Sequence, residues 1–516
     1  MLGTTDRQGS LLGVESLLAP LFEGDDSSFY ARMAAHGDGL VRDEDFADCY
    51  SMGMGRPSIP PALLMKTVLL QVRDDVSDRE AARRAAKDLD WKRALGVEAD
   101  QVPFHHTTLA VFRSRLLLND ADERVLRATL VHAVEAGLFP KRVLAIADST
   151  GVMGAAAVSD TYSLLRQAIA KLGSAASDRL AKRLRRAIDR VCVNKAGIDW
   201  ADADARRTHL GELVEVARAV LAATAGVDDL AEARDLLERI VDQDIEEAPD
   251  DGGGPGIRRG VARDRIVSVV DPDMRHGRKS PSKRVDGYKA HLLTDHDTEL
   301  VLAVGVTGAN APDGPEAAPM VATAQAAGVP VREMLGDTAY GDGDTRVAAE
   351  EIGVKVTAKT QPPASTGKFV KTDFVVDPDT PSATCPAGHA TTRHSWSTDH
   401  KGRRVMVMKF APDLCDACPL RQRCTTNSNG RSITLNFHEA RLQAARAEQA
   451  RPSTRRKLRR RALVERKLAE GKRHGMGKAR YRGTRKVLLQ QRVTAGLLNM
   501  KRLFALLDEP GRLQHA

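Results

Sequence analysis

The chain has 516 residues, 42% of them hydrophobic and 28% charged, which predicts a globular protein of about two to four domains. Lys and Arg number 78 against 69 Asp and Glu, and the net charge of +9 favours a polyanionic partner such as nucleic acid. No apolar run approaches the roughly 20 residues that span a bilayer, and no secretory signal is visible. These features exclude membrane and secreted proteins, and with only six cysteines we expect a reducing, cytoplasmic setting.

The first part of the chain predicts helices that carry positive charge. Residues 1–40 show little periodicity and are expected to form a lead-in with little structure, whereas residues 41–120 are helical in pattern. The capping-box sequence Ser77-x-x-Glu80 predicts the start of one helix. A helix-turn-helix-like DNA-binding module and a plain helical bundle with a solvated basic face account for this pattern equally well. In the first case the candidate DNA contacts are Arg83, Arg84 and Arg113.

A buried strand is predicted next, followed by a long helical segment. The apolar run 143–147 ends at Asp148, which predicts a central strand with a carboxylate at its carboxyl end. Helical spacing then fills residues 161–250, between two strand regions, and predicts a helical insertion. The Gly- and Asp-rich residues 250–256 are expected to be the hinge that ends it.

Strand patterns resume after the insertion. They are predicted at Ile266–Val270 and, as a hairpin, at Tyr288–Leu293 and Leu300–Val306. A helix and a further strand lead to Asp337. The order of strands and helices across residues 141–160 and 262–360 predicts an α/β fold with a mixed sheet of the ribonuclease H type. The two aspartates would then end neighbouring strands, where ligand sites of open α/β sheets lie.

The segment 361–437 is rich in Pro, Thr, Ser and Cys and predicts a loop-rich insertion. It contains four of the six cysteines, namely Cys385, Cys415, Cys418 and Cys424. Because such a segment can bury little core, four thiolates at this spacing could fold it around a structural Zn²⁺. The alternative is a set of unpaired thiols in a partly ordered loop.

The C-terminal residues 438–507 predict basic helices that complete the core. Between residues 451 and 486 there are 16 Lys or Arg and only two acids, one of which is Glu465. Arg461, Glu465 and Lys472 share one stripe of a helix. A glutamate in this setting can hold a metal ion while the two cations bind the adjacent phosphates. A surface ion pair is the simpler alternative for such a residue.

Asp148, Asp337 and Glu465 are therefore the candidate catalytic residues. Cleavage and transfer of phosphodiesters use two hard divalent cations held on carboxylates, one to activate the attacking oxygen and one to stabilise the leaving oxygen. We expect two Mg²⁺ ions here, with Mn²⁺ as a substitute. No nucleotide cofactor is expected, because the glycines at 252–256 lack the preceding strand and the following Lys-Ser/Thr of a phosphate-binding loop.

These candidates fall in motifs that resemble one protein family. Arg461-x3-Glu465-x6-Lys472 resembles the Y-x2-R-x3-E-x6-K signature of bacterial insertion-sequence DDE transposases, with Leu458 at the aromatic position. The segments around the two aspartates resemble the family's first two catalytic blocks, Ala147-Asp148-Ser149-Thr150 and Gly336-Asp337-Thr338-Ala339-Tyr340. Three segments between them are also similar: Asp271–Arg275, Asp286–Lys289 and Ala309–Asp313.

The resemblance implies an enzyme that recognises terminal inverted repeats and excises and inserts its own element. It implies that the three acids bind Mg²⁺ and that Arg461 and Lys472 contact the DNA ends; Arg275 and Lys289 are further candidates for DNA contacts. Pairing two ends, and capturing target DNA, implies at least a homodimer at the bacterial nucleoid, with no membrane partner. Two alternatives stay open: a catalytically silent DNA-binding derivative, and a ribonuclease H-like junction nuclease.

Overall fold

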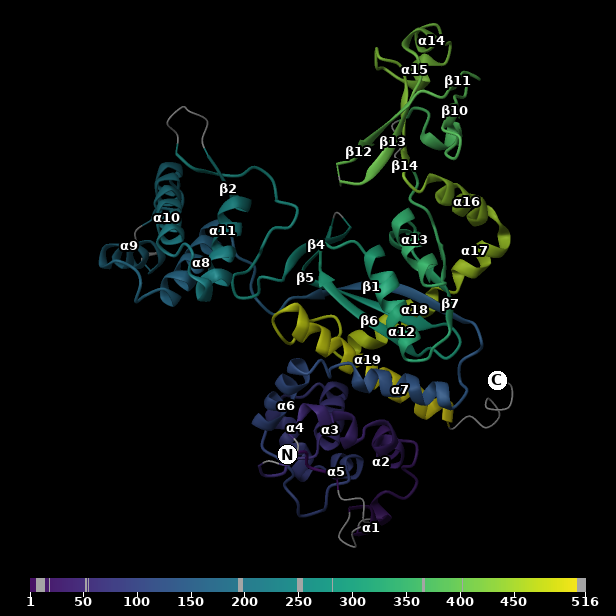
Figure 1. The fold of residues 1–516 in the computed structure, drawn as a ribbon. Helices are drawn as coiled ribbons and strands as arrows, with labels where there is room; N and C mark the ends of the chain where they lie inside the picture. The colour runs from purple at the N-terminus through teal and green to yellow at the C-terminus, as the bar shows by residue number, and fades with distance from the viewer. Residues whose placement is uncertain are drawn as a thin grey trace.

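The computed structural model describes residues 1–5, 14–17, 19–51, 53, 55–193, 198–247, 254–280, 282–363, 367–400 and 402–507. A central sheet lies against an N-terminal helical bundle, and two lobes project from the opposite side of the sheet (Figure 1). One lobe is helical, and the other contains small β-sheets. Among the helices in the described ranges, none combines the length and apolar character that crossing a bilayer requires.

The central sheet has six strands: β1 (Val143–Met153), β4 (Arg275–Ser280), β5 (Lys283–Asp295), β6 (Val301–Gly308), β7 (Val331–Gly336) and β8 (Lys355–Ala358). Their order is β4-β5-β1-β7-β8, with β6 also paired to β5. β1 runs antiparallel to β5 and parallel to β7, and β8 runs parallel to β7. The sheet is therefore mixed, and the predicted hairpin is confirmed as the antiparallel pair β5 and β6.

Strand β1 is longer than its apolar run predicts. It continues to Met153, so Asp148 lies within the strand and not at its end. Its parallel pairing with β7 stops at Ile146, whereas its antiparallel pairing with β5 continues to Met153. The change from apolar to polar residues thus marks the end of the pairing with β7.

Helices cover both faces of this sheet. Successive strand side chains point to opposite faces, and the core divides accordingly. Ala145 and Ala147 of β1 belong to the large cluster that includes α12 (Ala317–Ala326). Ile146, between them, packs in a separate cluster with Val464 of α18 (Ala462–Arg473). α12 and α18 therefore lie on opposite faces.

The N-terminal bundle consists of α2 (Phe29–Leu40), α3 (Pro61–Asp74), α4 (Asp78–Lys87), α5 (Leu89–Leu95), α6 (Thr107–Leu118) and α7 (Arg124–Glu135). α4 begins where the capping box predicts, and the Ser77 hydroxyl accepts the Glu80 N–H at 3.2 Å. The prediction of little structure across residues 1–40 is wrong for α2. Ser28 caps this helix by accepting the Ala31 N–H, and the helix buries Met33 and Leu40.

The last described helix, α19 (Thr484–Leu507), lies between the bundle and the sheet (Figure 1). It contacts α3 and α7 on one side and β6 on the other. Asn499 links both sides: its amide donates to the Thr129 hydroxyl and the Val301 carbonyl, and its Oδ1 accepts the Val301 N–H at 2.7 Å. Bundle and sheet therefore share one continuous hydrophobic core.

The helical lobe contains α8 (Thr161–Ala175), α9 (Lys182–Val193), α10 (Ala203–Ala223) and α11 (Ala231–Asp244), and these helices surround a core of their own. Residues 250–253 of the predicted hinge lie outside the described residues. The predicted strand Ile266–Val270 is wrong, because Ile266 and Val269 join the core of this lobe. The Gln243 amide of α11 bonds both the N–H (2.7 Å) and the carbonyl (3.0 Å) of Ile266, which takes the place of a strand ladder.

The other lobe corrects the prediction of a loop-rich insertion over 361–437. It holds two three-stranded sheets and two short helices: β9 (Val375–Asp377), β10 (Ser382–Thr384), β11 (Ala390–Thr391), β12 (His394–Thr398), β13 (Arg404–Lys409), β14 (Ser432–Asn436), α14 (Pro412–Asp416) and α15 (Arg421–Cys424). Most of these strands are too short to leave a periodic pattern in the sequence. We refer to residues 367–437 as the cysteine lobe.

Candidate active site

Asp148 and Asp337 point to the same face of the sheet. Asp148 follows Ile146 by two residues on β1, and Asp337 follows Leu335 of β7 by two residues in extended backbone. Because side chains two apart in a strand share a face, each acid lies on the side of its apolar neighbour. Ile146 and Leu335 both pack against Val464 of α18. Both aspartates are thus on the face that α18 covers.

Helix α18 also carries the third candidate acid. Arg461 is its N-cap residue, and the Arg461 Nη2 lies 3.8 Å from the Asp148 Oδ2. Glu465 is exposed one turn further along the same stripe. Within the described ranges, no three His, Cys, Asp or Glu side chains are close enough together to hold a metal ion. The structure therefore places Arg461 beside Asp148 and in the same cleft lining as Asp337, whereas Glu465 is exposed on α18.

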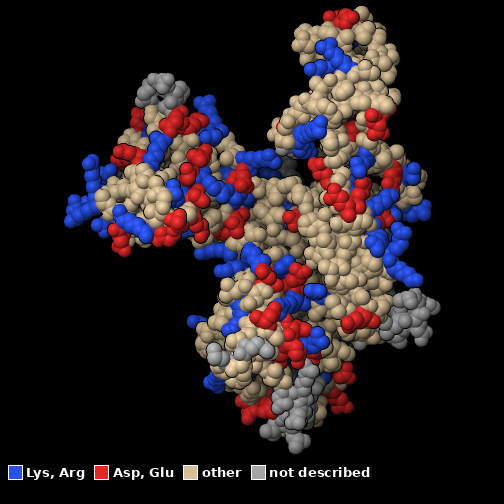
Figure 2. Space-filling view, viewed as in Figure 1, with Lys and Arg blue, Asp and Glu red and all other residues tan. Residues whose placement is uncertain are grey.

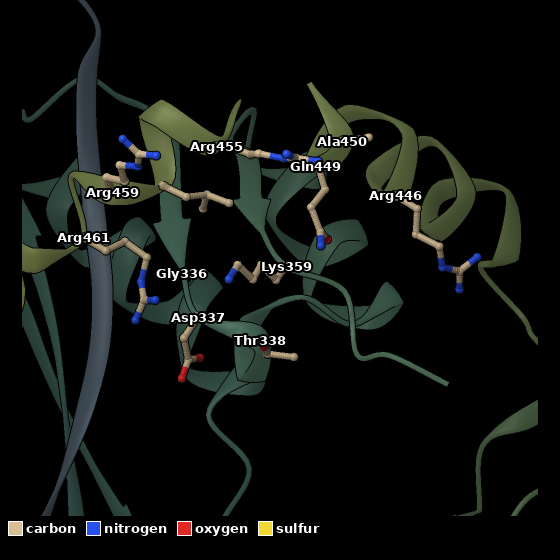
Figure 3. A pocket seen from close by; sticks show the side chains of 11 residues that line it. Gly336, Asp337, Thr338, Lys359, Arg446, Gln449, Ala450, Arg455, Arg459 and Arg461 are labelled. Atoms are coloured by element: carbon tan, nitrogen blue, oxygen red, sulfur yellow. The ribbon is translucent and has the colours of Figure 1, made fainter. Parts of the chain in front are cut away.

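A cleft of about 660 Å³ opens beside Asp337 (Figure 3). α16 (Glu439–Ala450) and α17 (Pro452–Arg459) form one wall, and the end of β7 and the residue after β8 form the other. Among the described residues that line this cleft Asp337 is the single acid, and five of the others are cations: Lys359, Arg446, Arg455, Arg459 and Arg461. More Lys and Arg side chains gather over α16 and α17 on the outside (Figure 2, right). The cleft therefore favours a polyanion.

The buried phenol of Tyr340 is subject to the negative charge of four carboxylates. Burial raises the pKa of this phenol well above its usual value, and Asp313, Asp148, Asp337 and Glu316 raise it further. Tyr340 is fully buried, and its hydroxyl has no hydrogen-bond partner among the described residues. Carboxylates are the ligands that Mg²⁺ and other hard divalent cations prefer, so the side-chain chemistry of Asp148 and Asp337 suits such an ion.

The predicted DNA contacts of the bundle are engaged within the chain. The Glu80 carboxylate accepts hydrogen bonds from Arg83 and Arg84, which lower the pKa of Glu80 to about 2. Arg113 is buried, with 8% of its surface exposed, and pairs with Asp78. Arg113 thus forms an internal ion pair in this structure, and its role as a DNA contact stays a prediction. Nothing in the structure tests Arg83 and Arg84, which stay predictions.

Two further predicted DNA contacts also turn inward. The Arg275 guanidinium binds the Asp264 carboxylate at 2.6 Å. The Lys289 ammonium lies 2.6 Å from the Asp313 Oδ1 and bonds a backbone carbonyl at the same distance. Both cations are therefore bound by groups of the protein itself. Lys472, by contrast, is exposed on α18.

The four cysteines of the cysteine lobe line one small pocket, together with His389 and Arg431. All four are free thiols. The Cys415 sulfur accepts the Arg431 N–H at 3.4 Å. Burial raises the pKa of the Cys424 thiol, Arg431 lowers it, and the other three cysteines raise it further.

The cleft contains cations that the sequence motifs do not single out. Arg455 and Arg459 lie within the basic run, where nothing in the pattern distinguishes them from their neighbours. Lys359 directly follows β8, so its place at the carboxyl edge of the sheet could have been anticipated. Asp313 directly precedes the 3₁₀ turn Gly314–Glu316, but its side chain makes no capping hydrogen bond there.

Two segments of the chain match models of known transposase families. Residues 384–504 match the model described as Transposase DDE domain, and residues 21–115 match the Transposase domain (DUF772). The first match includes Glu465, whereas Asp148 and Asp337 lie between the two. No curated protein and no solved structure matches the chain. Transposases act on DNA, and the DDE family generally uses divalent metal ions. Both matched models describe transposase domains, and together they indicate an insertion-sequence DDE transposase family.

Proposed function

We propose that the protein is a DNA transposase that binds the terminal inverted repeats of a bacterial insertion sequence and catalyses Mg²⁺-dependent strand cleavage and strand transfer. One observation carries this proposal: Asp148 and Asp337 share a sheet face with the helix that bears Glu465, and Arg461 of that helix contacts Asp148. The strand order β4-β5-β1-β7-β8, with its antiparallel hairpin and two parallel strands, supports a ribonuclease H-like core.

The three acids would hold the metal ions. Asp148 and Asp337 supply oxygens from two adjacent strands, and Glu465 supplies its carboxylate from the first turns of α18. Two Mg²⁺ ions, or Mn²⁺ in their place, would activate the attacking oxygen and stabilise the leaving oxygen. Arg461 meanwhile keeps a positive charge beside Asp148, which offsets the repulsion between the carboxylates.

The cleft would hold the DNA strand next to the scissile phosphate. Arg455, Arg459 and Lys359 line it beside Asp337, and phosphate oxygens are the natural partners of such cations. Lys472 lies two turns beyond Glu465 on the same exposed stripe and would extend the contact. The N-terminal bundle would recognise the repeats, and two copies of the chain would pair the two ends near the bacterial nucleoid.

The cysteine lobe would bind one structural Zn²⁺ through Cys385, Cys415, Cys418 and Cys424. Cys385 is separated in sequence from Cys415, Cys418 and Cys424, and all four thiols line one pocket. The lobe is small, and its core consists of Phe374, Ala383, Met406, Met408, Phe410, Ile433 and Leu435. A tetrahedral metal would add the cross-linking that so small a core lacks.

Single replacement of Asp148, Asp337 or Glu465 by Ala tests the assignment. The readout is excision of a marker flanked by the element's own inverted repeats. We expect excision to be lost in each variant while binding to the repeats persists. Near wild-type excision in any variant would refute that residue's role. A wild-type chain that binds repeats but never excises would instead indicate a silent derivative, and cleavage of branched DNA without repeats would indicate a junction nuclease.

A further inference from the structure

Strand β1 is held on only one side where it carries Asp148. Its pairing with β7 ends at Ile146, opposite Leu335, and from there to Val152 β5 is its only backbone pairing partner among the described residues, before Met153 forms a parallel bridge with Lys478. A strand with one neighbour is less constrained than a strand inside a sheet. If Asp148 is to hold its carboxylate in a fixed position for a metal ion, contacts other than strand pairing must help to fix it.

Ser149 and Asp313 provide a further contact, on one face of the sheet. Ser149 follows Asp148 and points to the opposite face of the sheet, toward α12. Its hydroxyl donates to the Asp313 Oδ2 at 2.7 Å, and its backbone N–H donates to the Asp148 Oδ1 at 2.8 Å. Ser149 thus connects the carboxylate of Asp148 on one face with that of Asp313 on the other.

Lys289 holds Asp313 in turn. It lies on β5 directly opposite Gly151 of β1, and its ammonium binds the Asp313 Oδ1 and the Ala311 carbonyl, both at 2.6 Å. Asp313 is 8% exposed, so its charge is buried and depends on this cation. The resulting chain of contacts runs from Lys289 through Asp313 and Ser149 to Asp148.

A helix-start role does not explain Asp313. It precedes the 3₁₀ turn Gly314–Glu316, but its side chain makes no capping hydrogen bond there. Asp342 shows what capping looks like in the same region, because its carboxylate accepts the N–H of Thr345 at 3.0 Å and the hydroxyl of that residue at 2.6 Å. Asp342 accepts the hydroxyl of Thr345, and Asp313 accepts the hydroxyl of Ser149. Of these two hydroxyl residues, only Ser149 directly follows a candidate metal ligand, Asp148.

We propose that Asp313 and Lys289 are positioning residues that fix the carboxylate of Asp148 for metal binding through Ser149. This inference rests on the proposed function of Asp148 as a metal ligand. Partners of this kind orient a ligand without touching the metal, and their loss typically weakens metal affinity or activity about 10- to 100-fold.

Direct binding of Mn²⁺ to the full-length protein, measured by electron paramagnetic resonance of the free ion, tests the proposal. We expect Asp313→Asn and Lys289→Met each to weaken Mn²⁺ binding about 10- to 100-fold. The Mg²⁺ concentration at half-maximal cleavage of an end duplex should rise in parallel, and binding of that duplex without metal should stay unchanged. Asp342→Asn is the matched control: it should lower the melting temperature and leave Mn²⁺ affinity unchanged.

A double variant separates positioning from general damage. If Asp313 and Lys289 act as one unit, the double variant should lose no more Mn²⁺ affinity than the single variants. If Asp313→Asn fails to fold, Ser149→Ala breaks the same contact from the other end and should give the same shift. Wild-type Mn²⁺ affinity in folded Asp313→Asn or Ser149→Ala would overturn the inference. Asp148→Ala provides the reference: wild-type Mn²⁺ affinity in that variant would instead refute the proposed function.

Discussion

Arg461 and Asp148 are far apart in the sequence, yet their side chains lie 3.8 Å apart between Nη2 and Oδ2. The distance exceeds that of a hydrogen bond, so the contact is electrostatic. The Nε of Arg461 is buried and has no hydrogen-bond partner among the described residues. Arg461 therefore offsets the charge of the acidic residues and retains a donor that a phosphate oxygen could use.

Phosphate contacts in the cleft should appear as salt dependence. Arg455→Ala and Arg459→Ala each remove one cleft cation, and each should lower the slope of log affinity against log salt by about 0.9. Fluorescence anisotropy with an end duplex over a series of salt concentrations measures this slope. Arg441→Ala is the control, because Arg441 pairs with Glu350 away from this cleft and its loss should leave the slope unchanged. An unchanged slope in both cleft variants would exclude the cleft as the DNA path.

The position of Glu465 should depend on the residue before it. Val464 is fully buried against Ile146 and Leu335, so Val464→Ala leaves a cavity under α18 and should cost about 1 to 3 kcal/mol of stability. Because the cavity lies beside the acids, cleavage of an end duplex should fall much more than binding. Leu468→Ala is the control: Leu468 is buried one turn later, in a different cluster, and its loss should lower the melting temperature with a smaller effect on cleavage. Equal losses of cleavage would contradict the idea.

The sequence predicts the acidic residues of this site better than its cations. Asp148 directly follows an apolar run, and this position is what singles it out in the sequence, although the strand continues beyond it. The fate of a cation depends on tertiary neighbours that a sequence pattern does not reveal. Arg113 and Lys289 look like DNA contacts in the sequence, but folding brings Asp78 and Asp313 within reach of them.

Irregular backbone is equally hard to predict. Ile266–Val270 has the β-branched composition of a strand, yet the side-chain amide of Gln243, 23 positions earlier, satisfies the backbone of Ile266. Such a contact carries no local signal. The short strands of the cysteine lobe escape prediction for a related reason. A strand of two residues, such as Ala390–Thr391, is too short to show the alternation of apolar and polar residues that predicts a strand.

Removal of metal from the cysteine lobe should loosen that lobe. The purified chain should contain one Zn²⁺, and a strong chelator, or Cys418→Ser, should release it and make residues 367–437 sensitive to protease. Cys192→Ser is the control, because Cys192 lies in the helical lobe, away from the pocket. Metal content by mass spectrometry of the intact protein and limited proteolysis provide the two readouts. A chain without zinc, resistant to protease with or without chelator, would refute the metal.

Stability should depend on pH through Glu439 at the start of α16. This carboxylate is 2% exposed, and burial alone would raise its pKa, but Lys371 at 2.7 Å and Arg446 at 2.8 Å more than offset this and leave the pKa lowered. A group with a lowered pKa in the folded state stabilises the fold above its unfolded value of about 4.3. That contribution is lost as the pH falls through the folded-state pKa.

Glu439→Gln should therefore cost about 3 to 5 kcal/mol at neutral pH, and the difference from wild type should shrink below about pH 4. Thermal unfolding of both proteins across this pH range measures the difference. Glu350→Gln serves as the control, because Glu350 pairs with Arg441 on the surface with 52% of its side chain exposed, and such pairs contribute little. If the effect of Glu439→Gln is the same at every pH, the ionised carboxylate is not the source of the stability, and loss of packing at α16 explains it instead.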